Sequence, residues 1–307
     1  MNFFVQGKFR LALASCLSAC SAMAQTPFHI PPPTKEIPLY EGVAPGSEHW
    51  DWEERTFTTR RGNNVTQNVV RPVLQFYPAA PAKVCGTAVI VAPGGGCTNL
   101  MVNNGIDTLR FLTAIGVHVF VLKYRLIYVD PNVPLPPPGP ALPPPPAPMD
   151  ANGIILDGPQ KGQNYIELAV RDGRQAVLRI RDIVGELNVK TNRVGFIGFS
   201  AGSVLGLALV DGPRETRPDF IGAIYGAKEE PLPPPDAPPL FIAVAADDEW
   251  AASPSLALFA AWRKAKRPAE LHVFQTGGHG FVVKGGGGDH CLERFQEWMT
   301  SNGWLSR

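Results

Sequence analysis

The chain has little net charge, few charged residues and no run of basic residues. Lys and Arg total 28, Asp and Glu total 27, and charged residues make up only 18% of the 307 positions. Without a concentrated positive surface we expect no nucleic-acid partner. No apolar stretch reaches the roughly 18 residues that a helix needs to cross a bilayer, so we also expect no membrane span. With 45% hydrophobic residues, the chain can form a large globular core.

Patterns typical of metal and cofactor sites are missing as well. The sequence has no HEXXH and no His, Cys and Asp cluster at ligand spacing, so we expect no metal and no other cofactor. The glycines of PGGG at 93–96 lack the following Lys-Ser/Thr of a phosphate-binding loop. Any chemistry is therefore expected from the side chains themselves.

The chain has only five cysteines, and Cys16 and Cys20 lie near the N-terminus. Cys85 and Cys97 stand at opposite ends of a predicted strand, which puts them too far apart to form a disulfide. Two alternatives remain open, a disulfide between Cys97 and Cys291 or three unpaired thiols.

The first 24 residues have the features of an export signal. Lys8 and Arg10 precede a short apolar stretch at 11–19, and Ala-Met-Ala at 22–24 is a typical cleavage site before Gln25. The sequence therefore predicts a periplasmic or secreted protein, with the mature chain beginning at residue 25.

A second interpretation concerns the same segment. Leu-Ser-Ala-Cys at 17–20 resembles the bacterial lipobox, in which the cysteine is lipidated and becomes the mature N-terminus. Cleavage before Gln25 and lipid attachment at Cys20 remain alternatives, and either one predicts export.

Beyond this segment, short apolar runs alternate with stretches of helical periodicity. Most of the runs are β-branched and nearly all apolar, as in parallel strands that are covered on both faces. We expect strands within 69–78, 87–96, 117–126, 193–199, 220–226, 240–246 and 270–276, and helices within 106–116, 166–184, 253–265 and 291–299. The alternation predicts one α/β domain over 25–307, a doubly wound, mostly parallel sheet with helices on both faces.

Two proline-rich segments, 131–148 and 231–239, interrupt this pattern. Proline lacks the amide hydrogen that the interior of a sheet requires, so both are expected at the surface. The insertion at 131–148 is either a stiff loop without a role or a flap that shapes a substrate cleft.

The stretch GFSAG at 198–202 matches G-x-S-x-G and lies between a predicted strand and a predicted helix at 201–210. A chain that turns this sharply has room only for glycines beside the serine, and the turn exposes the serine hydroxyl at the start of the helix. The pattern predicts that Ser200 is a nucleophile.

A serine hydroxyl needs a base, and the base needs an orienting carboxylate. The next two strands end in Asp247-Asp248 and in GGHGF, which contains His279. We predict that His279 is the base, with His290 as its rival. The residues alone leave Asp247 and Asp248 open as the acid.

Backbone amides must also stabilise the oxygen that becomes negatively charged during acyl transfer. The strand that ends near residue 92 runs into Gly94, Gly95 and Gly96, which allow the backbone to approach a substrate closely. We predict an oxyanion hole with N–H donors from Gly95 or Gly96 and from Ala201.

These motifs, together with IPLYEGVAPGSE, NVVRPVLQFYPA, VFVLKYRL and AELHVFQTGGHGF, resemble those of the α/β-hydrolases. In particular they resemble the exported carbohydrate esterases of the acetyl xylan esterase or feruloyl esterase-like type, over most of residues 37–305. The resemblance implies that Asp248, the second aspartate of an A-D-D strand end, is the acid. It places Cys97 where a tyrosine is common, and Ser203 where a small glycine is common.

The resemblance implies a serine carboxylic-ester hydrolase with Ser200, His279 and Asp248 as its triad. We expect a small-molecule or carbohydrate ester as substrate, first of all acetyl groups on plant polysaccharide or oligosaccharide such as xylan. A general carboxylesterase or feruloyl esterase is the alternative, and a non-catalytic surface binding protein on a hydrolase fold is a remote one. Cys97 and Trp250 are the candidate substrate contacts. For Trp250 two alternatives stay open, stacking on a sugar ring or aromatic acid and packing against the proline-rich lid.

Overall fold

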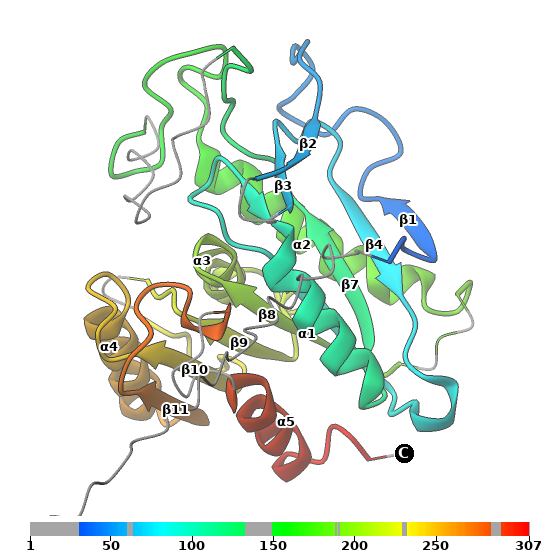
Figure 1. Ribbon diagram of the computed structural model, residues 1–307, viewed down its shortest axis with the longest axis vertical. Coiled ribbons are helices and arrows are strands. Elements are labelled where there is room, and N and C mark those ends of the chain that lie inside the picture. Colours follow the sequence, from blue (N-terminus) through cyan, green and yellow to red (C-terminus); the bar gives the residue numbers. More distant parts are fainter. Residues whose placement is uncertain are drawn as a thin grey trace, which may run out of the picture.

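A computed structural model describes residues 31–59, 64–132, 149–187, 189, 191–228, 232–283 and 290–306. Its centre is an eight-stranded sheet, seen in Figure 1. From one edge to the other, the strands are β1 (Lys35–Pro38), β4 (Val73–Tyr77), β7 (His118–Lys123), β5 (Thr87–Ala92), β8 (Arg193–Phe199), β9 (Phe220–Ile224), β10 (Leu240–Ala245) and β11 (Ala269–Phe274). All seven predicted strands are therefore found, six within their expected ranges and β11 beginning one residue before its range.

The six strands from β7 to β11 are parallel, which confirms a mostly parallel sheet. β4 pairs antiparallel with both β1 and β7, so the sheet is mostly but not wholly parallel. Only residues 78–86 connect β4 to β5, and they contain just the short 3-10 helix η1 (Pro81–Lys83). Two parallel strands need a longer crossover connection, so the chain reverses direction between β4 and β5.

Side chains of β5 alternate between two separate apolar clusters. Ile90 and Ala92 belong to one cluster, and Val89 and Val91 belong to the other, because successive residues of a strand face opposite sides of a sheet. Both faces are therefore buried and both must be covered. The continuous apolar sequence of this strand follows from that double burial.

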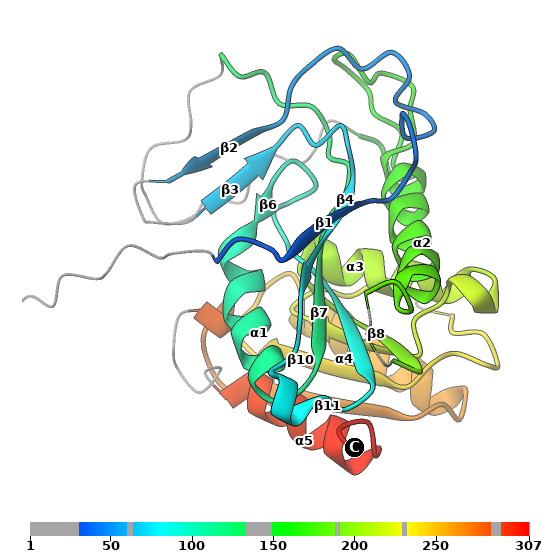
Figure 2. The ribbon, with the colours of Figure 1, turned by 90° about the vertical axis from the view of Figure 1, so that its right-hand side faces the viewer.

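Helices cover the two faces, as Figure 2 shows in a view along the sheet. One face carries α1 (Val102–Ala114) and α5 (Cys291–Ser301), and the other carries α2 (Tyr165–Ile183), α3 (Ala201–Ala208) and α4 (Ala252–Lys264). Short 3-10 helices complete the chain at η2 (Leu209–Asp211), η3 (Arg214–Thr216) and η4 (Phe281–Val283). This arrangement confirms the α/β-hydrolase prediction of a doubly wound sheet with helices on both faces.

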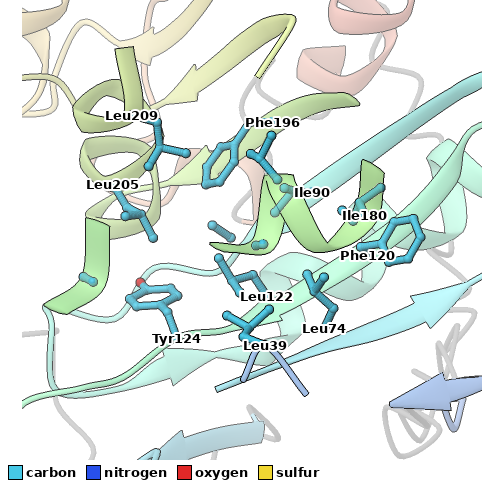
Figure 3. Packing of buried hydrophobic residues seen from close by; sticks show 14 of the residues in the cluster. Leu39, Leu74, Ile90, Phe120, Leu122, Tyr124, Ile180, Phe196, Leu205 and Leu209 are labelled. Atoms are coloured by element: carbon cyan, nitrogen blue, oxygen red, sulfur yellow. The ribbon is translucent and has the colours of Figure 1, made fainter. Parts of the chain in front are cut away.

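The core beneath α2 and α3 is shown in Figure 3. Ile180 of α2 and Leu205 of α3 lie over Ile90 and Phe120 of the sheet. The helix α2 begins where the side chain of Asn164 accepts a hydrogen bond from the amide of Glu167, at 3.0 Å. Such an N-cap contributes about 1 kcal/mol. The apolar stripe of α2 then docks the helix on the sheet.

A second, three-stranded sheet was not expected from the sequence. It consists of β2 (Arg55–Thr58), β3 (Asn64–Gln67) and β6 (Leu100–Met101), in that order. Its strands are antiparallel and at most four residues long, which is too short for a clear period-two pattern. β6 directly precedes α1, so this sheet adjoins the glycine loop that follows β5.

A buried ion pair joins β7, α2 and the N-terminal segment. Nη2 of Arg125 donates to Oδ1 of Asp172 at 2.7 Å, and both side chains are fully buried. The backbone amide of Arg125 donates to Oδ2 of the same carboxylate at 2.9 Å, and the hydroxyl of Tyr40 donates to Oδ1 at 3.0 Å. Nη1 of Arg125 donates to the carbonyl of Pro45 at 2.7 Å. This cluster therefore fixes residues 40–45 against the domain.

Of the two proline-rich segments, 232–239 forms an irregular connection into β10, with Leu232 exposed and Ala237 buried. Residues 133–148 lie outside the described part, so the alternatives for that insertion stay predictions. Among the described helices, none combines the length and the apolar character that crossing a membrane requires.

Candidate active site

Ser200 lies at the sharp turn between β8 and α3. Its φ of 52° and ψ of −119° are strained for a non-glycine residue. A Cβ on Gly198 would lie 2.1 Å from the carbonyl oxygen of Gly202, and a Cβ on Gly202 would lie 2.2 Å from the carbonyl oxygen of Ala92. Both glycines are therefore required by close backbone contacts. The turn holds the Ser200 hydroxyl at the carboxyl edge of the sheet, beside the first turn of α3.

His279 and Asp248 form a chain of hydrogen bonds with this serine. Oγ of Ser200 lies 2.9 Å from Nε2 of His279, and Nδ1 of His279 lies 2.9 Å from Oδ2 of Asp248. An ionised carboxylate only accepts hydrogen bonds, so Nδ1 of the neutral ring carries the hydrogen and Nε2 accepts the one from Ser200. The structure thus brings together the three residues of the predicted triad, although Ser200 and His279 are 79 positions apart in the chain.

The Asp248 carboxylate is held on both oxygens. Oδ1 accepts hydrogen bonds from the amides of Trp250 and Ala251, each at 3.0 Å, while Oδ2 faces His279. The Asp248 side chain is fully buried, whereas that of His279 is 32% exposed. The carboxylate is therefore fixed and dry, and the imidazole it orients remains accessible.

Asp247 points elsewhere and has a different partner. Its carboxylate accepts hydrogen bonds from the amides of Gly277 at 3.2 Å and Gly278 at 2.8 Å. These glycines directly precede His279, so Asp247 fastens the loop that carries the histidine. The sequence had left the two aspartates open, and the resemblance had favoured Asp248.

Two aromatic rings flank His279. The ring centroid of Tyr225 lies 5.1 Å from that of His279, and so does the centroid of Trp250; both rings meet the imidazole edge-on, with interplanar angles of 72° and 63°. Tyr225 is buried and Trp250 is exposed. Sequence reasoning singled out Trp250 but missed Tyr225, although its place just after β9 on the same edge of the sheet was a usable signal.

Three further histidines among the described residues have contacts of their own. His290 precedes α5, where its exposed ring contacts Glu293. His118 is buried in β7 and accepts a hydrogen bond from the amide of Ala79 through Nδ1. His272 of β11 pairs with Glu270. The rival base His290 is thus not beside Ser200.

The glycine loop after β5 lies directly against Ser200. A Cβ on Gly94 would come within 2.9 Å of Cβ of Ser200. Gly95 and Gly96 have φ values of 142° and 62°, and the buried hydroxyl of Tyr124 donates to the carbonyl of Pro93 at 2.7 Å. The loop therefore lies close to the nucleophile.

Ala201 is the first residue of α3, on the other side of the serine. The first amides of a helix have no acceptor within the helix, and they carry the positive end of the helix dipole. The structure thus places all three predicted oxyanion donors, Gly95, Gly96 and Ala201, in segments that border Ser200.

All three described cysteines, Cys85, Cys97 and Cys291, are free thiols, which decides between the two alternatives left by the sequence. Burial raises the pKa of Cys97, and its hydrogen bond with Tyr165 acts in the opposite direction. Cys97 also packs against the core. Burial raises the pKa of Cys291 to about 12. The thiols of Cys97 and Cys291 therefore favour the protonated form and are poorly suited to nucleophilic chemistry.

Within the described ranges, no group of three or more His, Cys, Asp or Glu side chains is arranged to hold a metal ion.

Comparisons with known proteins agree with this architecture. No protein-family model matches the chain. An acetylxylan esterase from Xylanibacter ruminicola is 26% identical over 164 residues, which is 53% of this chain and 26% of that protein. The chain thus spans about a quarter of the length of this curated relative.

Two solved structures extend the comparison. The acetyl ester-xyloside bifunctional hydrolase from Caldicellulosiruptor lactoaceticus is 23% identical with a TM-score of 0.60, and the match covers 89% of this chain and 98% of that one. MGS-M1, an α/β-hydrolase enzyme from a Medee basin deep-sea metagenome library, is 18% identical with a TM-score of 0.52, covering 82% and 98%. The resemblance predicted from the motifs is confirmed: the chain has the α/β-hydrolase fold and is similar to carbohydrate esterases.

Proposed function

We propose that this protein is a serine carboxylic-ester hydrolase that removes short acyl groups, first of all acetyl groups, from plant polysaccharide or oligosaccharide. The observation that carries the proposal is the continuous hydrogen-bonded array from Ser200 through His279 to Asp248, built on a strained turn. The similarity to an acetylxylan esterase, and to a structure described as an acetyl ester-xyloside hydrolase, supports the substrate class.

In the proposed mechanism, Nε2 of His279 takes the proton of Ser200 as Oγ attacks the acyl carbonyl carbon. Asp248 holds the ring in the required tautomer and stabilises the imidazolium that forms. The oxygen of the tetrahedral intermediate is stabilised by amides of Gly95 or Gly96 and of Ala201. His279 then protonates the departing sugar oxygen, and the acyl group stays on Ser200.

Deacylation repeats these steps with water. His279 takes a proton from water, the resulting nucleophile attacks the acyl-enzyme, and Ser200 recovers its proton as the carboxylic acid leaves. The proton returns to its starting position after each cycle, so the enzyme is regenerated. Cys97 stays a predicted substrate contact in this scheme, although its thiol hydrogen bonds to Tyr165.

The test is acetate release from acetylated xylan by the wild type and by Ser200→Ala, alongside an acetyl and a longer-chain nitrophenyl ester. We expect the wild type to release acetate from the polysaccharide, and the variant to lose at least about 10³-fold in rate. Turnover of nitrophenyl esters alone favours a general carboxylesterase or feruloyl esterase. Full activity of the variant contradicts the role given to Ser200. No activity of the wild type on any of these esters contradicts the catalytic assignment and favours a binding protein.

We also propose that the protein is exported, on the basis of the signal-like sequence at 1–24, which lies outside the described residues. Mass spectrometry of the mature N-terminus tests this. A peptide that begins at Gln25, or a lipidated Cys20, supports one of the two routes. An intact N-terminus beginning at Met1 contradicts both.

A further inference from the structure

Trp250 is the single exposed aromatic side chain among the described residues. It is 51% exposed. An indole is the largest side chain, and leaving its apolar surface in water forgoes a large free energy of burial. Tyr225 stands at the same 5.1 Å distance from the His279 ring but is only 2% exposed. One ring therefore supports the imidazole from within the core, and the other extends the site to the surface.

The backbone of Trp250 is fixed by the same turn that fixes the acid. Its amide donates to Oδ1 of Asp248 at 3.0 Å, and the amide of Ala251 donates to the same oxygen. The edge-on contact with His279 then limits where the ring can lie. Trp250 thus presents a largely pre-positioned surface, which loses little conformational entropy when a ligand binds.

The order of the strands separates the two parts of an ester substrate. The glycine loop follows β5, on one side of β8, whereas Asp248 and Trp250 follow β10, on the other side. The carbonyl oxygen of the ester faces the amides on the glycine-loop side. The departing oxygen must receive a proton from Nε2 of His279, so it lies within hydrogen-bond reach of that atom. Trp250 therefore borders the alcohol part of the substrate.

We propose that Trp250 is the platform for the alcohol part of the ester, on which the ring of the sugar next to the scissile bond stacks. An indole offers a flat apolar surface that matches the C–H face of a pyranose, while the sugar hydroxyls stay in water. This inference rests on the proposed function, because it names which part of the carbohydrate ester this residue binds.

The test compares acetate release from acetylated xylotriose and from ethyl acetate, which share the acyl group and differ only in the alcohol. For Trp250→Ala, we expect the ratio of kcat/KM for the sugar ester to kcat/KM for ethyl acetate to fall about tenfold or more. Trp250→Tyr should recover most of the ratio, because it restores an aromatic face. Leu256→Ala, at a 53% exposed position of α4, is the matched control and should leave the ratio unchanged.

An equal loss on both esters would overturn the inference, because Trp250 would then act only through His279. A changed preference between acetyl and butyryl esters of ethanol, with the ratio for the two alcohols unchanged, would overturn it as well, since the indole would then contact the acyl group. If the wild type hydrolyses ethyl acetate but not the sugar ester, the carbohydrate assignment itself fails. That failure is visible before any Trp250 variant is measured.

Discussion

The site around Ser200 and the junction between Arg125 and α2 are both built on a fully buried carboxylate, but the partners differ. The Asp172 side chain pairs with the guanidinium of Arg125, which is equally buried. The Asp248 side chain pairs with the imidazole of His279, which is 32% exposed. A guanidinium keeps its proton at all relevant pH values, whereas an imidazole is the side chain that exchanges one near neutrality.

This difference separates a permanent structural link from a site that can do chemistry. The guanidinium of Arg125 donates to groups that only accept hydrogen bonds, namely the Asp172 carboxylate and the carbonyls of Pro45 and Leu168. His279 instead hydrogen bonds to Asp248 through one nitrogen and to the hydroxyl of Ser200 through the other. Loss of the first carboxylate should therefore affect folding, and loss of the second should affect catalysis.

The largest expected effect is that of Asp248→Asn on activity. The amide fits the same space but leaves Nδ1 of His279 without an ionised acceptor, so the wrong tautomer is favoured and the imidazolium is not stabilised. We expect kcat/KM for an acetyl ester to fall by about 10³- to 10⁴-fold, with little change in the urea midpoint of unfolding.

The adjacent Asp247→Asn is the matched control, because an amide oxygen still accepts a hydrogen bond from the loop at Gly277 and Gly278. We expect it to lose less than about tenfold in kcat/KM. If Asp247→Asn lost more in kcat/KM than Asp248→Asn, Asp247 would be the acid and the role given to Asp248 would be overturned.

The next effect concerns folding and comes from the other carboxylate. Asp172→Asn leaves the buried charge of Arg125 without a counter-charge, which should lower the free energy of unfolding by about 3 to 5 kcal/mol. Urea denaturation followed by circular dichroism measures it. The exposed pair of Arg171 and Glu167 on the same helix provides the control. Glu167→Gln should lower the free energy of unfolding by less than about 0.5 kcal/mol. An equal loss for both variants would contradict the structural role given to the buried pair.

Much of the site could be predicted from the sequence because the relevant signals are local. Gly198 is required by its contact with Gly202, and both glycines belong to the short G-x-S-x-G pattern around Ser200, although Gly202 also packs against the distant Ala92. His279 lies in the loop that follows β11. The choice between Asp247 and Asp248 was harder. The two are adjacent, and they differ only in the direction in which their side chains leave the turn, which residue type and spacing do not encode.

Features that join distant parts of the chain were not predictable in this way. Arg125 and Asp172 are 47 positions apart, and nothing in either local sequence marks them as partners. The same holds for the small sheet, whose β3 pairs with the two-residue β6. In each case contacts between distant segments determine the structure, and the local sequence pattern contains little information about those contacts.

The smallest expected effect comes from a third buried ionisable residue, His118, whose surroundings differ from both carboxylate sites. Its Nδ1 accepts a hydrogen bond from Ala79, and its buried Nε2 has no hydrogen-bond partner within the described structure. Burial lowers the pKa of His118, so the folded chain favours the neutral ring. As pH falls through the ordinary pKa of histidine, about 6.5, the unfolded chain takes up a proton that the folded chain resists, and stability declines. His118→Asn keeps an acceptor for Ala79 but cannot titrate. Urea midpoints measured between pH 7.5 and 5 should therefore fall less steeply for the variant than for the wild type, and parallel curves would show that His118 is not a source of the pH dependence.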